Sequence, residues 1–175
     1  GMMDCKKALV EANGDFEAAV DLLRKKGQKV SAARSGNATS EGQVLINVSA
    51  DGTNGKLVAL ACETESVSKV EDFNNLAQAI LTVAVANNPT SVEELSAIAL
   101  TDGRTVAETI TELTGKIGEK IVIQNYENVT GEKIVSYIHS NGKMGVLVAF
   151  EGAQGTDITE AGKDVAMQIA AMNPV

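Results

Sequence analysis

The chain has 175 residues, of which 44% are hydrophobic and 22% are charged, and this composition is typical of a folded protein. Only 3% are aromatic and none is Trp, so we expect an aliphatic core. A net charge of −8 disfavours direct binding to nucleic acid. The sequence has neither a signal peptide nor ~20 consecutive apolar residues, which disfavours a membrane partner and favours a cytoplasmic protein.

Two short helices are predicted at the start of the chain, over about residues 3–12 and 15–27, with Gly27 closing the second. Helices of this length bury too little apolar surface to be stable alone, so a third helix or a partner should cover them. We therefore predict a helical N-terminal module at residues 1–27. The small, polar residues 28–42 are typical of a linker, in which a short helical piece is expected near residues 30–34.

The body of the chain begins with a predicted β-hairpin, and Asn141-Gly142 is a strong signal for a second one. Apolar periodicity and helix-capping residues indicate the other elements. The predicted strands are 44–50, 56–63, 119–126, 132–140 and 144–150, and the predicted helices are 70–86, 91–99, 105–114 and 159–171, the last ending before Asn173-Pro174.

One repeat is visible within the body. The run N-G-K-L-V-A-L at 54–60 resembles N-G-K-M-G-V-L-V-A-F at 141–150, and each run lies in a strand-turn-strand unit followed by a helix. This pattern predicts a duplicated β-hairpin-plus-helix core with antiparallel sheets, and hence an α+β fold. We place one core subdomain at 43–118 and the other at 119–175.

Residues suited to catalysis or metal binding are sparse. Cys5 and Cys62 lack the spacing of a disulfide or metal site, and Cys62–His139 is the one conceivable nucleophile-base pair, although a strand cysteine more often packs in the core. No glycine-rich phosphate-binding motif is present. An acidic run is more typical of a solvated helix start than of a cation site: Glu63, Glu65, Glu71 and Asp72. We expect no catalytic residue, no cofactor and no metal, and so not an enzyme.

Surface suited to contact with another protein is the remaining signal. Met2 and Met3 precede a helix in a module that is too small to bury both, and Met is common at adaptable binding surfaces. His139 lies near a predicted hairpin tip, where a polar ring meets solvent or a partner. These residues favour a protein-interaction function.

Several blocks, in fixed order, resemble the bacterial elongation factor Ts family over essentially the whole chain. The blocks are M-M-D-C-K-K-A-L-V-E-A-N-G-D at 2–15, C-E-T-E-S-V-S-K at 62–69, K-I-G-E at 116–119, Y-I-H at 137–139, G-V-L-V-A-F at 145–150 and D-V-A-M-Q-I-A-A-M-N-P at 164–174. The resemblance implies a UBA-like N-terminal module. It also implies a fragment that lacks the family's first N-terminal helix and its C-terminal region.

The same resemblance implies a translation elongation factor that acts as a guanine nucleotide exchange factor. Such a protein binds elongation factor Tu and promotes release of GDP and Mg²⁺. The alternative is an interaction module without exchange activity, and a homo-oligomer is left open. The residues that the resemblance implies as partner contacts are Met2, Met3, Glu65, Ser66, Ile117, Gly118 and His139.

The expected wedge of the family departs from its usual pattern in this chain. An Asp-Phe pair is usual there, whereas this chain has Glu65-Ser66. Glu keeps the charge, but Ser removes an apolar side chain whose burial is worth ~1.5–3 kcal/mol. Our hypothesis is that Val67 partly substitutes for the ring, with Phe73 as the other neighbouring apolar residue.

Overall fold

A helical pair forms the N-terminal end of the computed structural model, which describes residues 2–172. The pair consists of α1 (Met2–Glu11) and α2 (Phe16–Arg34), and the Asp15 side chain caps α2 by accepting from the Ala18 amide at 3.0 Å. Helix α2 packs against α6 (Val106–Ile117), which supplies the expected third helix. The predicted Asn173-Pro174 stop lies outside the described residues.

Gly27 does not end the second helix, contrary to the sequence-based prediction. It is buried in the middle of α2, where a Cβ built on Gly115 of α6 would lie 2.6 Å from the Gly27 Cα atom. Glycine is therefore required for the close approach of two helices, and not for a left-handed C-cap. The short helical piece expected near residues 30–34 of the linker is the end of α2, which continues through residues 28–34 and crosses the boundary placed at residue 27.

The first sheet has three antiparallel strands in the order β1-β2-β3. The strands β1 (Glu41–Val48) and β2 (Asn54–Cys62) form the predicted first hairpin. Strand β3 (Ile121–Thr130) pairs with the whole of β2, from Cys62↔Ile121 to Asn54↔Thr130. The boundary predicted between residues 118 and 119 therefore separates β3 from its pairing partner.

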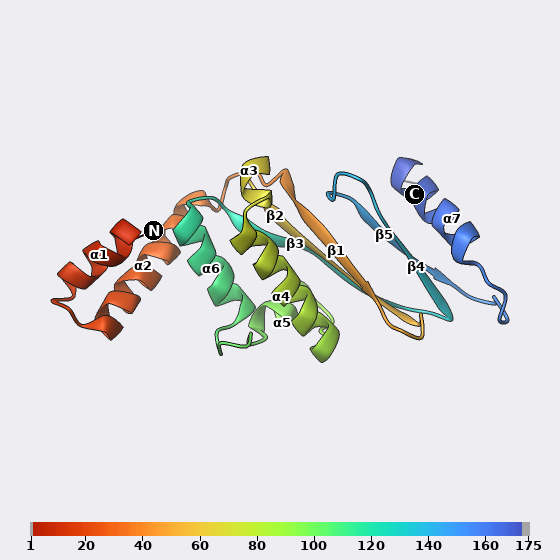
Figure 1. Ribbon diagram of the computed structural model, residues 1–175, viewed down its shortest axis with the longest axis horizontal. Coiled ribbons are helices and arrows are strands. Elements are labelled where there is room, and N and C mark those ends of the chain that lie inside the picture. Colours follow the sequence, from red (N-terminus) through yellow and green to blue (C-terminus); the bar gives the residue numbers. More distant parts are fainter. Residues whose placement is uncertain (1, 173–175) are drawn as a thin grey trace.

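Helices cover one face of this sheet (Figure 1). They are α3 (Glu65–Ser68), α4 (Glu71–Asn87), α5 (Val92–Ala97) and α6, and all except α3 were predicted. Phe73 and Ile80 on α4 are fully buried against Val58 and Leu60 of β2, which gives the expected aliphatic core. Among the described residues, no helix has both the length and the apolar character needed to cross a bilayer.

A second antiparallel sheet lies on the opposite face of the first one (Figure 1). It consists of β4 (Lys133–Ile138) and β5 (Gly145–Phe150), and α7 (Thr159–Met172) covers its outer side. Glycine allows the two sheets to approach, because a Cβ on Gly145 would lie 2.6 Å from the Val44 Cγ1 atom. The fold is α+β, with the hairpin-plus-helix units β1-β2-α4 and β4-β5-α7.

Candidate functional site

Three segments meet at one end of the first sheet, where Glu41, Cys62 and Ile121 lie opposite one another in neighbouring strands. They are residues 63–70, which include α3, residues 117–120, which begin with the last residue of α6, and residues 139–144 between β4 and β5 (Figure 1). We call these three segments the α3 edge. It contains all the predicted contact residues except Met2 and Met3.

Hydrogen bonds tie α3 to the segment after α6. The Thr64 amide and hydroxyl donate to the two carboxylate oxygens of Glu119 at 3.0 and 2.8 Å. The Lys120 amide donates to Glu63 at 2.6 Å, and Arg34 donates to both oxygens of the same carboxylate at 2.9 Å. These donors, the Lys120 amide first, lower the pKa of Glu63. The geometry of α3 is therefore fixed by residues distant in sequence.

The α3 turn presents polar side chains outward and an apolar one inward. Glu65 and Ser66 are exposed, and Glu65 forms an ion pair with Lys69 at 2.7 Å that lowers the pKa of the Glu65 carboxyl. Val67 is only 7% exposed and packs in the core with the fully buried Phe73. Neither Val67 nor Phe73 faces outward in the free chain, and partial substitution of the missing ring by Val67 stays a prediction.

The end of α6 offers backbone rather than side chains. Gly118 caps the helix in the left-handed conformation, with φ 86°, and its amide donates to the Thr114 carbonyl at 2.8 Å. A Cβ at Gly118 would meet nothing within 4 Å, so the backbone there is open. Ile117 is half-buried against the core, with part of its surface accessible.

The loop between β4 and β5 is fastened to β1 beside α3. The Val44 amide donates to the Gly142 carbonyl at 2.8 Å, and Lys143 forms an ion pair with Glu41 that raises the pKa of the Lys143 amine. The loop spans residues 139–144, longer than the two-residue turn predicted at Asn141-Gly142, because the His139 amide bonds to the Met144 carbonyl at 2.9 Å. No sequence motif points to Lys143, whose partner lies on a distant strand.

His139 and the two N-terminal methionines are all exposed. His139 Nδ1 lies 3.0 Å from the Tyr137 hydroxyl. Met2 is 88% exposed and Met3 63%. Met2 also lines a hollow of about 580 Å³ together with Gly115 and Lys116, so α1 begins beside the last turn of α6. Met2 therefore lies near one end of the α3 edge.

Cys62 and His139 do not form a nucleophile-base pair. Cys62 is buried and donates to the Thr64 carbonyl at 3.2 Å, whereas His139 lies beside Tyr137. Burial, and then the negative charge of Glu119, raise the pKa of the Cys62 thiol to about 11. Within residues 2–172, no group of three His, Cys, Asp or Glu side chains is arranged to hold a metal ion.

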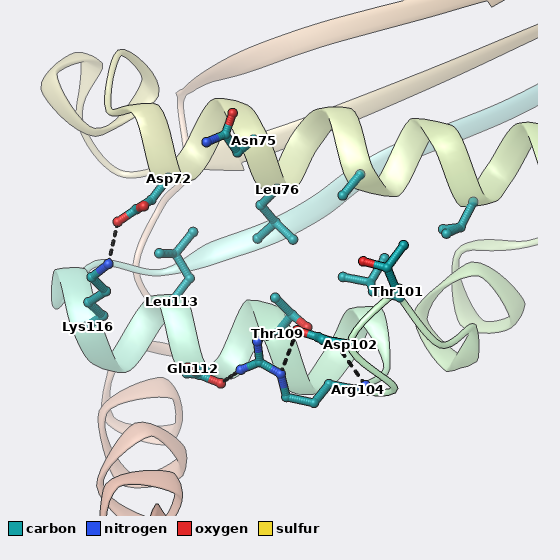
Figure 2. A pocket seen from close by; sticks show the side chains of 13 residues that line it. Asp72, Asn75, Leu76, Thr101, Asp102, Arg104, Thr109, Glu112, Leu113 and Lys116 are labelled. Atoms are coloured by element: carbon teal, nitrogen blue, oxygen red, sulfur yellow. Dashed lines mark hydrogen bonds and ion pairs between the residues drawn. The ribbon is translucent and has the colours of Figure 1, made fainter.

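A groove of about 310 Å³ separates α4 from α6 on the helical face (Figure 2). Leu76 and Leu113 are among its apolar lining residues. At one end Lys116 contacts Asp72 at 2.6 Å, and at the other Arg104 forms ion pairs with Asp102 and Glu112. Because both cations are already paired with carboxylates of the same groove, the groove is a weaker candidate for recognition than the α3 edge.

Comparison with known proteins identifies the family of the chain. Residues 63–175 match the family described as Elongation factor TS. Proteins named Elongation factor Ts from Cytophaga hutchinsonii, Amoebophilus asiaticus and Porphyromonas gingivalis are 69%, 53% and 47% identical over all 175 residues of the chain. The chain spans 63%, 63% and 62% of the lengths of these curated relatives. The chain belongs to the elongation factor Ts family.

Proposed function

We propose that the chain is a translation elongation factor of the cytoplasm that binds elongation factor Tu and promotes the release of GDP and Mg²⁺. The observation that carries the proposal is the α3 edge, which gathers Glu65, Ser66, Ile117, Gly118 and His139 from three separate segments. Family membership supports the same assignment. Met2 and Met3 would extend the contact through the N-terminal helices, for which a UBA-like module is the proposed type.

Exchange of this kind needs no chemistry from the chain itself. A protein that binds the nucleotide-free form of a GTPase more tightly than the GDP form must weaken GDP binding by the same factor. The α3 edge suits such a role because its backbone is held by the Thr64–Glu119 and Lys120–Glu63 hydrogen bonds. A pre-ordered contact surface loses little conformational entropy on binding.

A second candidate function is an interaction module that binds the same partner without exchange. Ser66 offers little apolar surface, while Val67 and Phe73 are buried in the core. If insertion of an apolar side chain is necessary to disturb the nucleotide site, this pattern favours binding without release.

Release of fluorescent GDP from elongation factor Tu separates the two candidates. The complex is mixed with the chain and excess unlabelled GDP in a stopped-flow instrument, and binding is measured in parallel by pull-down. We expect release to accelerate and to saturate with chain concentration. Binding without acceleration would establish the interaction module, and absence of both would reject both candidates.

A matched pair of variants tests whether the α3 edge is responsible. Glu65 and Glu127 are both exposed glutamates, but Glu127 lies on β3, outside the α3 edge. We expect Glu65→Gln to slow the stimulated release several-fold and Glu127→Gln to leave it unchanged. Equal effects of the two variants would contradict the assignment of the site.

A further inference from the structure

The segment from Thr64 to Phe73 contains three apolar side chains, which differ in their exposure to solvent. Val67 and Phe73 are 7% and 0% exposed and belong to the core. Val70 is 38% exposed. Val70 is therefore the apolar side chain that this segment presents to solvent.

Single exposed apolar residues are ordinary on protein surfaces, but Val70 occupies an unusual position. It is the N-cap of α4 and makes no side-chain capping hydrogen bond. Valine is among the poorest N-cap residues, because it has no oxygen to accept from the first free amides of the helix. Polar side chains do accept such bonds at three other helix starts in this chain, at Asp15, Ser91 and Thr105. The sequence thus forgoes a stabilising cap at α4, which is typical of a residue kept for function.

Val70 is continuous with the exposed polar pair of α3. The Lys69 amide bonds to the Ser66 carbonyl at 3.3 Å, and the Val70 amide bonds to the Val67 carbonyl at 3.0 Å, so α3 turns directly into Val70. In the first turn of α4, Asp72 contacts Lys116 at 2.6 Å, next to the C-terminal end of α6. Val70 is therefore the last residue of the first segment of the α3 edge, two residues before the contact of Asp72 with α6.

We infer that Val70 is a binding residue of the α3 edge and supplies its apolar contact with the partner GTPase. This inference rests on the proposed function. In the complex the Val70 side chain is removed from water against an apolar surface of the partner. In the free chain, the same side chain leaves the start of α4 uncapped.

Val70→Thr tests both the binding role of Val70 and the missing cap, because threonine keeps the shape of valine and has, in place of one methyl group, a hydroxyl that can cap α4. The melting temperature of the free chain should rise. The affinity for elongation factor Tu should fall roughly fivefold or more, since a methyl group is lost and a hydroxyl is buried in the complex. The rate of stimulated GDP release, measured at a sub-saturating concentration of the chain, should fall by the same factor. The control is Val85→Thr, at a valine of the same helix that is 39% exposed and distant from α3. This control should leave release and affinity unchanged.

The outcomes separate failure of the inference from failure of the proposed function. If the unsubstituted chain accelerates GDP release and Val70→Thr does so equally well, the role of Val70 is overturned and the proposed function stands. Equal losses of affinity in Val70→Thr and Val85→Thr would likewise overturn the role of Val70. A fall in the melting temperature of Val70→Thr that accounts for its lower activity would overturn it too. If the unsubstituted chain neither binds nor accelerates release, the proposed function fails and the inference fails with it.

Discussion

At the scale of single residues, the two cysteines have opposite environments. Cys5 is exposed on α1, whereas Cys62 is buried at the end of β2 and has a pKa raised to about 11. The thiolate is the reactive form of cysteine, so at about pH 8 only about a thousandth of Cys62 would be reactive even if a reagent reached it.

We therefore predict that one thiol reacts rapidly with a disulfide reagent in the native chain. Cys62 should react only after unfolding, and the Cys5→Ser variant should show no rapid phase. The measurement is a spectrophotometric thiol titration with and without denaturant. Two rapid thiols in the native chain would show that the Cys62 end of β2 opens readily.

Residue-level prediction from sequence was weakest in the α3 segment, on which the proposed function rests. Apolar periodicity identifies a buried face over several helical turns, as in α4, but α3 has only four residues. Nothing in so short a run indicates that Val67 turns inward while Val70 stays at the surface. The turn that contains Val67 begins at Thr64, whose hydrogen bonds to Glu119 join residues far apart in the chain.

At the scale of elements, the crossing of α2 and α6 depends on two facing glycines. A Cβ on Gly115 would lie 2.6 Å from the Gly27 Cα atom, a backbone contact that no side-chain rotation relieves. Sequence alone suggested a C-cap for Gly27, because glycine after a cationic last turn is typical of a helix end. The close approach that requires glycine there comes from α6, which lies far away in the sequence.

We predict that Gly115→Ala destabilises the chain by ~1–3 kcal/mol, although alanine is the better helix former, because α2 and α6 must separate. Gly36→Ala is the control, since a Cβ at Gly36 meets nothing within 4 Å. Urea unfolding followed by circular dichroism measures both variants. A Gly115→Ala variant as stable as the unsubstituted chain would show that the helices do not cross so closely.

At the scale of the whole molecule, the fold places a helical layer, two sheets and α7 one on another (Figure 1). The repeat at 54–60 and 141–150 did predict the two hairpin-plus-helix units, because it is a local pattern. The pairing of β3 with β2 and the stacking of the sheets at Gly145 are long-range contacts without a local signal. The convergence of three segments at the α3 edge follows from those contacts. The resemblance to a known family implied the members of the α3 edge, but no sequence pattern indicated that they assemble.

The α3 edge is the surface proposed to bind elongation factor Tu. Amide hydrogen-deuterium exchange of the chain, measured with and without nucleotide-free elongation factor Tu, tests this claim. We predict slower exchange at residues 64–70, 117–120 and 139–144, and unchanged exchange in the β1–β2 turn around Asp51, at the opposite end of the first sheet. Protection of that turn, or of the groove between α4 and α6, with the α3 edge unchanged, would contradict the claim.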